Sequence, residues 1–288
     1  MVFLAVYAFA GIAAAGTPLL GSTLPPGSTP PLGSLVWPQP QSQTTTNATL
    51  RVDAAAFKFE TGSTSAVLAA ALKRYRPICF PPGRRAATPN SALPQLRALR
   101  VTVASANESL ALNVSERYEL RIAAAGGTST LTADTVWGAV RGLESFAQLL
   151  NQRSDGAVLA QSVVDWPRFP FRSVMVDSAR HFLPVELLRA HIDALAYAKM
   201  NRMHWHLTDT CAFPYASTLF PNLSAAGAFD AAHVYSPADV GGLVEYGRLR
   251  GVVIVPEFDS PGHSTPGWRG GPPQLLAACG IRPDLEEK

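Results

Sequence analysis

Residues 251–258 read Gly-Val-Val-Ile-Val-Pro-Glu-Phe, an apolar run that ends beside a carboxylate. Continuous apolar runs of this kind are typical of strands buried on both faces of a parallel sheet. Arg172–Val176 and Asn201–Leu207 are predicted as two earlier strands, and the helices Pro184–Lys199 and Ser236–Arg250 are predicted between the strands. This alternation of strand and helix predicts an α/β chain whose second part follows the pattern of a TIM-type (β/α)8 barrel.

The start of the second helix is marked by its sequence. Ser236 stands at the N-cap position, Pro237 follows at the first helical position, and Asp239 is the third helical residue. A serine at the cap accepts a hydrogen bond from the first turn, and a proline is tolerated there because that N–H would have no helical partner. We therefore expect the helix to open at this point.

Polar side chains gather at the predicted carboxyl end of all three strands. They are Asp177, Ser178 and Arg180 after the first strand, His204, His206 and Asp209 on the second, and Glu257, Asp259 and His263 after the third. In barrels of this type the reactive groups lie at that face of the molecule. A barrel without a reaction to catalyse would not need ionisable groups at all three ends, so the pattern predicts an active site there.

These side chains also have structural interpretations. Arg180 is either a surface ion-pair partner or a fork that holds hydroxyl groups of a ligand. His204 and His206 share one face of their strand because side chains alternate, so they either bind a metal ion or are core imidazoles. Glu257 and Asp259 also share a face, and one of them has an alternative role in holding the loop that follows.

Upstream, residues 35–165 mix strands and helices, which predicts a small α+β domain. The expected strands are Leu99–Val103, Tyr118–Ile122 and Ser129–Ala133, and the expected helices are Ser65–Tyr75 and Thr135–Leu150. No charged or nucleophilic cluster stands out in this part of the sequence. We therefore expect the domain to serve as a scaffold for residues 166–288.

The first 34 residues indicate export. Residues 1–16 are almost wholly apolar and end in small residues, which predicts a signal peptide, and residues 17–34 are rich in Pro, Gly and Ser, which predicts a linker. Four glycan acceptor sequences begin at Asn47, Asn107, Asn113 and Asn222. The three cysteines, Cys79, Cys211 and Cys279, cannot all pair within one chain. The net charge of +3, without clustering of the basic residues, gives no indication of a nucleic-acid surface.

Several long segments resemble the family 20 glycoside hydrolases, the β-N-acetylhexosaminidases of the lysosomal or vacuolar type. The segments that carry the resemblance are Val176–Pro184, Met203–Asp209, Phe213–Tyr215, Tyr246–Gly251 and Pro256–His263, together with Trp137–Glu144 upstream. They occur in the family's order and extend over nearly all of residues 36–268. The resemblance implies that the chain hydrolyses terminal N-acetylglucosamine or N-acetylgalactosamine from glycans.

The resemblance also implies a retaining reaction assisted by the substrate, which is an exception to the two-carboxylate rule of most glycosidases. The 2-acetamido oxygen of the sugar attacks the anomeric carbon, a Glu protonates the leaving oxygen, and an adjacent Asp orients the acetamido group. Arg180 matches the arginine that binds sugar hydroxyls, and Asp209 and His263 match the residues that hydrogen-bond toward the acid Glu. No metal ion and no cofactor is implied.

The sequence departs from the family at two places. It contains no Gly-Gly-Asp-Glu-like segment, so the acid Glu and its neighbouring Asp are absent, and Thr210 stands where a second Asp is usual. The barrel is therefore expected to be truncated after about three βα units. Two alternatives remain: a non-catalytic fragment that binds sugar or a partner subunit, and a metal-dependent hydrolase that uses His204, His206 and Asp209.

The resemblance implies further expectations about the setting of the protein. Its partners would be N-acetylhexosamine-terminated oligosaccharides, glycoproteins or glycolipids, with homo- or heterodimer formation and no stable membrane span. The location would be the secretory pathway, ending in the lysosome or vacuole or outside the cell.

Overall fold

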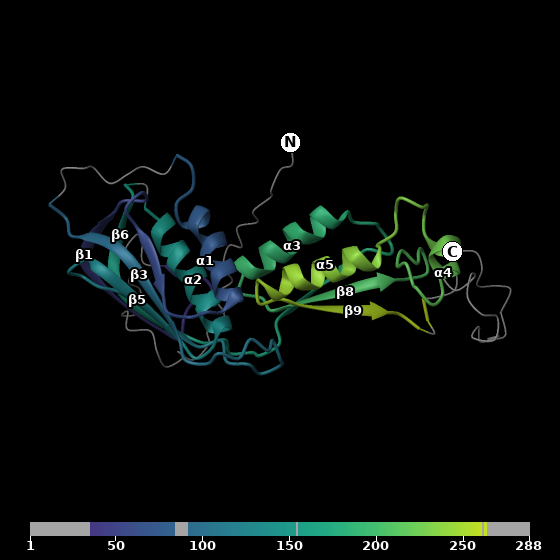
Figure 1. Cartoon of the computed structure of the whole chain (residues 1–288), viewed down its shortest axis with the longest axis horizontal. Helices are drawn as coiled ribbons and strands as arrows, with labels where there is room; N and C mark the ends of the chain where they lie inside the picture. Colours follow the sequence, from purple (N-terminus) through teal and green to yellow (C-terminus); the bar gives the residue numbers. More distant parts are fainter. Residues whose placement is uncertain (1–34, 84–91, 154, 261, 264–288) are drawn as a thin grey trace, which may run out of the picture.

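A computed structural model describes residues 35–83, 92–153, 155–260 and 262–263. The expected signal peptide and linker, and Cys279, lie outside these residues. Two units follow each other along the long axis of the molecule (Figure 1). No helix within the described ranges is both long and apolar enough to cross a membrane.

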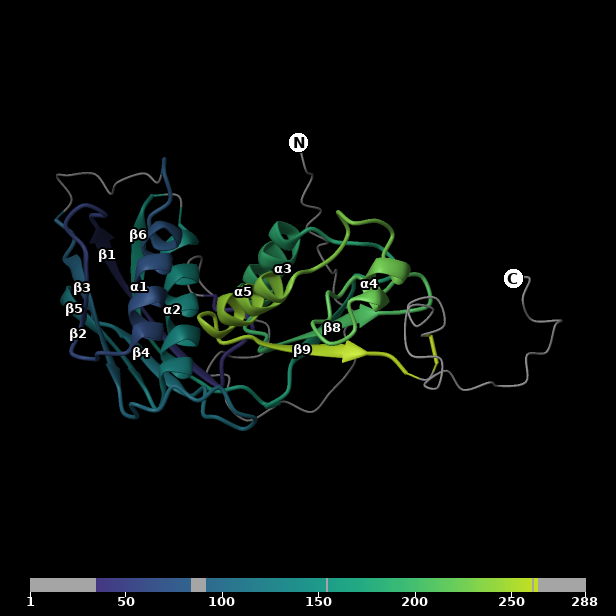
Figure 2. The same cartoon turned by 45° about the vertical axis from the view of Figure 1, so that its right-hand side comes forward.

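The N-terminal unit is a six-stranded mixed sheet covered by two helices. Its elements are β1 (Ser42–Val52), β2 (Lys58–Thr61), α1 (Ala66–Cys79), β3 (Gln95–Val103), β4 (Tyr118–Ile122), β5 (Gly127–Ala133), α2 (Val136–Asn151) and β6 (Ala157–Asp165). The strand order is β1-β6-β4-β5-β3-β2. Helices α1 and α2 lie on the face of the sheet that is turned toward the second unit (Figure 2).

Helix α2 is the buried centre of this unit. It begins where the side chain of Thr135 accepts hydrogen bonds from the amides of Trp137 and Gly138, which would otherwise have no partner in the first turn. Gly138 permits a close approach, because a Cβ there would lie 2.3 Å from the carbonyl oxygen of Arg117. The helix thus packs directly on the segment that leads into β4.

The second unit contains three parallel strands with helices on one side. Its elements are β7 (Ser173–Asp177), α3 (Val185–Tyr197), β8 (Arg202–Thr208), α4 (Asn222–Gly227), α5 (Pro237–Arg248) and β9 (Val253–Phe258). The strand order is β7-β8-β9, and both pairings are parallel. Buried residues of α3, α5 and the strands form one apolar cluster, including Leu188, Trp205 and Leu243. The mixed α/β architecture expected from the sequence is confirmed.

Local sequence patterns anticipated most of these elements. The strands and helices predicted at 99–103, 118–122, 129–133, 65–75 and 135–150 are all present, with longer bounds in several cases. The capping box at Ser236 is confirmed, since its side chain accepts from the Asp239 amide while the Asp239 carboxylate accepts from the Ser236 amide. Four elements were not anticipated, namely β1, β2, β6 and α4.

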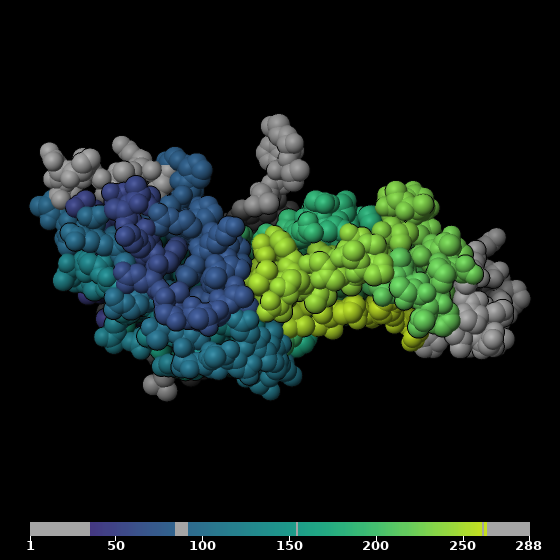
Figure 3. All heavy atoms as spheres, viewed as in Figure 1, coloured from purple at the N-terminus to yellow at the C-terminus, as the bar shows by residue number. Residues whose placement is uncertain are grey.

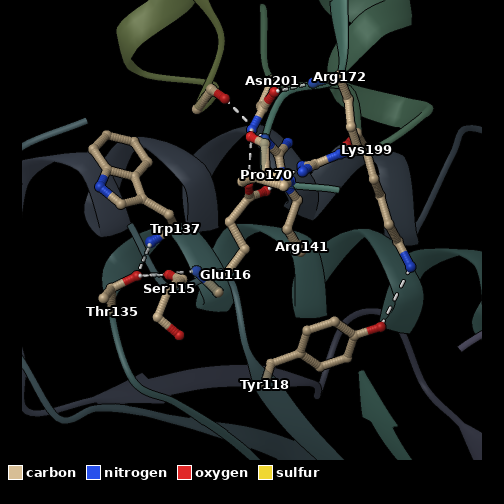
Figure 4. A network of polar contacts seen from close by, with 12 residues as sticks. Ser115, Glu116, Tyr118, Thr135, Trp137, Arg141, Pro170, Arg172, Lys199 and Asn201 are labelled. Atoms are coloured by element: carbon tan, nitrogen blue, oxygen red, sulfur yellow. Dashed lines mark hydrogen bonds and ion pairs between the residues drawn. The ribbon is translucent and has the colours of Figure 1, made fainter. Parts of the chain in front are cut away.

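A buried polar network joins the two units, and it corrects the expectation that residues 35–165 hold no charged cluster (Figure 4). Glu116, only 5% exposed, accepts from Arg141 Nε and Arg172 Nη2 at 2.6 Å each and from Asn201 Nδ2 at 2.9 Å. Arg141 also donates to the carbonyl oxygen of Gly251 at 2.8 Å. Arg172 and Asn201 directly precede β7 and β8, and Gly251 lies two residues before β9. Glu116 and Arg141 together therefore hold the starts of all three strands.

Lys199 forms a second part of the junction. Its Nζ donates to Ser145 Oγ at 2.8 Å and to Tyr118 Oη at 3.3 Å, and it lies 3.6 Å from Asp165 Oδ2. Burial lowers the pKa of Lys199, and the nearby carboxylates of Asp165 and Glu144 only partly oppose this effect. A cavity of about 220 Å³ is lined by Glu116, Tyr118 and Lys199. It lies at the starts of the strands, away from their carboxyl ends.

Candidate active site

The candidate site is built on one row of residues across the second sheet. Asp177, His206 and Glu257 are aligned by the parallel register of β7, β8 and β9. Side chains alternate along each strand, and neighbours in register point to the same face. The three ionisable side chains therefore lie next to one another at the carboxyl end of the sheet, as the sequence predicted.

Arg180 connects two carboxylates. Its Nη1 donates to Asp177 Oδ2 at 2.5 Å, and its Nη2 lies 2.8 Å from Asp209 Oδ2. The Asp177 carboxylate also accepts from the amides of Ala179 and Arg180, which fixes the turn after β7. Burial opposes ionisation of Asp177, but these hydrogen bonds lower its pKa. The Arg180 side chain is still 46% exposed, so its remaining N–H groups can reach a ligand.

His206 lies between two carboxylates. Its Nε2 is 2.8 Å from Asp209 Oδ2, and its Nδ1 is 2.9 Å from Glu257 Oε2. The imidazole is almost completely buried, as is Asp209. Burial by itself favours the neutral ring, but the hydrogen bonds with Glu257 and Asp209 outweigh burial and raise the pKa of His206. The ring is thus held from both sides.

Glu257 serves both histidines of β8. Its Oε2 lies 2.5 Å from His204 Nε2 as well as 2.9 Å from His206 Nδ1. The hydrogen bond with His206 lowers the pKa of Glu257 and the bond with His204 adds to the effect, against a smaller contribution from burial. The two histidines do share a face, and a carboxylate connects them.

His263 lies close to Asp209, but its nearer partner is another carboxylate. His263 Nδ1 is 3.0 Å from Asp259 Oδ2 and 3.8 Å from Asp209 Oδ2. The residue has a positive φ of 56°, and its side chain is 61% exposed. The structure therefore brings Arg180, Asp209 and His263 together around one oxygen atom, Asp209 Oδ2. Its other oxygen, Oδ1, accepts from the amide of Thr210 at 2.6 Å.

The metal interpretation finds little support in this arrangement. Asp209 faces Nε2 of His206, whereas Glu257 faces Nδ1 and is the partner of His204. His204 and Asp209 therefore lie toward opposite sides of the His206 ring, and the three residues do not converge on one point. Ligand-type atoms lie within 4.8 Å of one another in three groups of the described residues, namely Asp177–His206–Asp209, His206–Glu257–Asp259 and Asp209–Asp259–His263, and His204 belongs to none of them. We assign no metal ion to them.

The sequence pointed to every residue of this site, but it did not reveal their connections. The sequence places Asp177 at a polar strand end. The opposite charge of Arg180 three residues later is the signal that could have predicted their contact. No local pattern indicated that Glu257 would join His204 to His206, because the residues are 51 and 53 positions apart.

Two family models match the chain. One is described as glycosyl hydrolase family 20, catalytic domain, and matches residues 169–286. The other is described as beta-acetyl hexosaminidase like and matches residues 36–149. The matches therefore fall on the second and the first unit of the structure, respectively.

Curated relatives include two kinds of hexosaminidase subunit. The chain is 39% identical over 281 residues to beta-hexosaminidase subunit beta of Felis catus, which covers 93% of this chain and 52% of that protein. It is 37% identical over 262 residues to beta-hexosaminidase subunit alpha of Rattus norvegicus, covering 86% and 49%. The chain thus spans about half the length of the curated relatives that it matches.

Solved structures show the same relationship. The chitobiase of Flavobacterium johnsoniae superposes with a TM-score of 0.71 at 27% identity, covering 83% of this chain and 36% of that one. The N-acetyl-beta-hexosaminidase of Streptomyces plicatus, solved in complex with Thio-NAglucal, gives a TM-score of 0.65 at 25% identity, covering 83% and 48%.

Proposed function

Because the chain belongs to glycosyl hydrolase family 20, we propose that it acts as a β-N-acetylhexosaminidase, cleaving terminal N-acetylglucosamine or N-acetylgalactosamine from glycans. The observation that carries the proposal is the convergence of Arg180, His206 and His263 on the Asp209 carboxylate at the carboxyl ends of the strands. Such ends are where enzymes with this strand–helix alternation place their reactive groups.

Each residue has a defined part in the proposed reaction. Arg180 binds hydroxyls of the terminal sugar through the N–H groups that its two carboxylate partners leave over. Asp209 and His263, whose Oδ2 and Nδ1 atoms lie 3.8 Å apart, lead toward the acid that protonates the leaving oxygen. The acetamido group of the substrate supplies the nucleophile, so none of the residues described has to form a covalent bond with the sugar. No cofactor enters this reaction.

The architecture that accompanies this function is also a proposal. Residues 35–165 form the N-terminal domain of the family, and residues 166–288 form three βα units of the (β/α)8 barrel. The support is that the three parallel strands have helices on one side, while exposed side chains such as Met175 and Val255 occupy the other face, which would be the barrel interior. Of the proposed domain, the structure describes 166–260 and 262–263.

The relatives suggest the setting. Their names contain subunits alpha and beta, and we propose that this protein likewise forms a homo- or heterodimer. Its substrates would be N-acetylhexosamine-terminated oligosaccharides, glycoproteins or glycolipids. The proposed location is the secretory pathway, with the lysosome or vacuole or the extracellular space as its end. The glycan acceptors Asn47, Asn107, Asn113 and Asn222 are all exposed, as the attachment of glycans in the secretory pathway would require.

Hydrolysis of a chromogenic N-acetylglucosaminide tests the proposal. The assay compares the 288-residue chain with any longer product of its transcript, and with an Arg180→Ala variant of whichever form is active. We expect turnover that falls at least 100-fold in the variant, because the hydroxyl contacts are lost. Turnover that needs added zinc, or that is unchanged in the variant, would contradict the proposed reaction.

A second candidate is a chain that binds the sugar without cleaving it. It is favoured by the Arg180 side chain, which is 46% exposed at the strand ends and can donate to sugar hydroxyls without any reaction. Equilibrium binding of N-acetylglucosamine distinguishes the two candidates. Saturable binding that is lost in Arg180→Ala, without turnover at any pH between 4 and 8, would identify a sugar-binding chain.

A further inference from the structure

His206 has an unusual set of neighbours for a histidine. Both of its ring nitrogens face a carboxylate oxygen at hydrogen-bond distance, Nε2 toward Asp209 and Nδ1 toward Glu257. A neutral imidazole carries only one N–H, so one of its nitrogens can donate and the other can only accept. An ionised carboxylate can also only accept. Two ionised carboxylates on one neutral ring would therefore leave one contact without a proton.

A proton on Asp209 would remove the negative charge that its contact with Arg180 depends on. Asp209 Oδ2 also lies 2.8 Å from Arg180 Nη2, and Oδ1 accepts from the Thr210 amide. Two donors besides His206 thus act on this carboxylate, one on each oxygen. Glu257 Oε2 is in a similar position, because it faces both His204 Nε2 and His206 Nδ1. The contacts are all satisfied together when both ring nitrogens of His206 carry a proton.

We propose that Glu257 holds His206 as an imidazolium whose Nε2–H donates to Asp209, so that Glu257 and His206 are positioning residues for the Asp209 carboxylate. The result is a row of alternating charges across the three strand ends. It runs from Glu257 through His206, Asp209 and Arg180 to Asp177. The proposal extends the proposed function in stating what fixes Asp209, but the charge of His206 does not depend on turnover.

The surroundings of the ring favour the cation. Asp177 adds a third negative charge from β7. On the loop after β9, Asp259 presents a carboxylate oxygen within 4.8 Å of a ring nitrogen of His206, and His263 is paired with Asp259. The positive group nearby is Arg180, which is itself paired with two carboxylates, and His204 shares Glu257 with His206. Four carboxylates thus act on His206, opposed by the positive charge of Arg180.

Holding Asp209 in this way has a consequence for its geometry. Its Oδ2 receives His206 from one side and Arg180 from another, and its Oδ1 receives the Thr210 amide. Rotation of the carboxylate about its last bond would break all three contacts at once. Asp209 is therefore presented to its further partner, His263, in one orientation, as positioned catalytic groups require.

Side-chain ¹⁵N–¹H spectra of the whole chain, labelled at its six histidines, test the inference. At pH 7 we expect two N–H signals from His206, with the nitrogen shifts of an imidazolium. In Glu257→Gln, the midpoint at which His206 loses its second proton should fall by one pH unit or more, on the order expected for removing an adjacent charge. The Thr210 amide should exchange with solvent faster in the same variant, because Asp209 is no longer fixed.

A matched control removes a carboxylate from a different histidine. Asp230 Oδ1 lies 2.6 Å from His233 Nδ1 at an exposed site, so Asp230→Asn should leave the midpoint of His206 and the exchange rate of the Thr210 amide unchanged. A single His206 N–H signal in the wild type at pH 7 would overturn the inference. So would a Glu257→Gln variant with an unchanged His206 midpoint. The wild-type spectrum decides by itself if the variant does not fold, and no sugar is needed, so failure of the proposed function would be seen separately.

Discussion

Glu116 is expected to be among the most costly carboxylates to alter in the described part of the chain. It is buried, and it accepts three hydrogen bonds from residues on three different segments (Figure 4). Changing Glu116→Gln keeps the shape but removes the charge, which leaves Arg141 and Arg172 without their common counter-ion. Breaking one side of a buried ion pair typically costs about 3–5 kcal/mol.

The structure places the cost at the lower end of that range. Arg141 retains its bond to the Gly251 carbonyl, and Arg172 retains its bonds to the carbonyl oxygens of Lys199 and Phe169. Neither arginine is therefore left wholly unsatisfied, and we expect a loss of about 3 kcal/mol. With a urea dependence of about 3 kcal/mol per molar, which is the upper end for small proteins, the unfolding midpoint should fall by about 1 M.

The assay is urea unfolding together with hydrogen exchange. Because the network holds the starts of β7, β8 and β9, amides of these strands should lose protection more than those of the N-terminal sheet. The matched control is Glu60→Gln, which breaks the exposed pair of Glu60 with Arg100 and should cost less than about 1 kcal/mol. An equal midpoint shift in the two variants would refute the reasoning.

Burial raises the pKa of both Glu144 and Asp165. The native state therefore binds more protons than the unfolded chain at pH values above the ordinary carboxyl range, and stability should fall as the pH rises through this window. Melting temperatures should accordingly be higher near pH 5 than near pH 7, and Glu144→Gln should reduce the difference. Gly138→Ala should destabilise by about 2 kcal/mol or more in urea unfolding, because the new Cβ would meet the Arg117 carbonyl. Gly241→Ala on α5 meets nothing within 4 Å and should stabilise by up to about 1 kcal/mol.

Local chemistry explains what the sequence could predict. The capping box at Ser236 and the apolar run before Glu257 are complete within a few residues, so their structures follow from nearest neighbours. Polar residues at the ends of adjacent parallel strands must then lie together, so the sequence alone predicts that Arg180, Asp209 and His263 lie in one region.

Contacts between distant segments account for the features that the sequence could not predict. Glu116 and Asn201 are 85 positions apart, and no local sequence pattern predicts the hydrogen bond between them. Likewise, β1 is rich in Thr and becomes a strand chiefly through antiparallel pairing with β6, more than 100 positions away. Pairing of this kind depends on the folded sheet and leaves little trace in local periodicity.

The Glu116 network and the candidate active site lie at opposite ends of the same three strands, and this separation has a testable consequence. Arg172, Asn201 and Gly251 mark the starts of the strands, while Asp177, His206 and Glu257 stand at their ends. At about 3.3 Å per residue, five or six residues separate the clusters by roughly 17–20 Å.

An electrostatic effect over that distance is largely screened at physiological salt. A substitution at Glu116 can therefore affect the candidate active site only by displacing the strands. In Glu116→Gln, under conditions where the chain stays folded, the two His206 N–H signals should therefore remain. Their loss in the folded variant would mean that the strands transmit movement from their starts to their ends. The N-terminal unit would then help to position Asp209, in addition to stabilising the sheet that carries it.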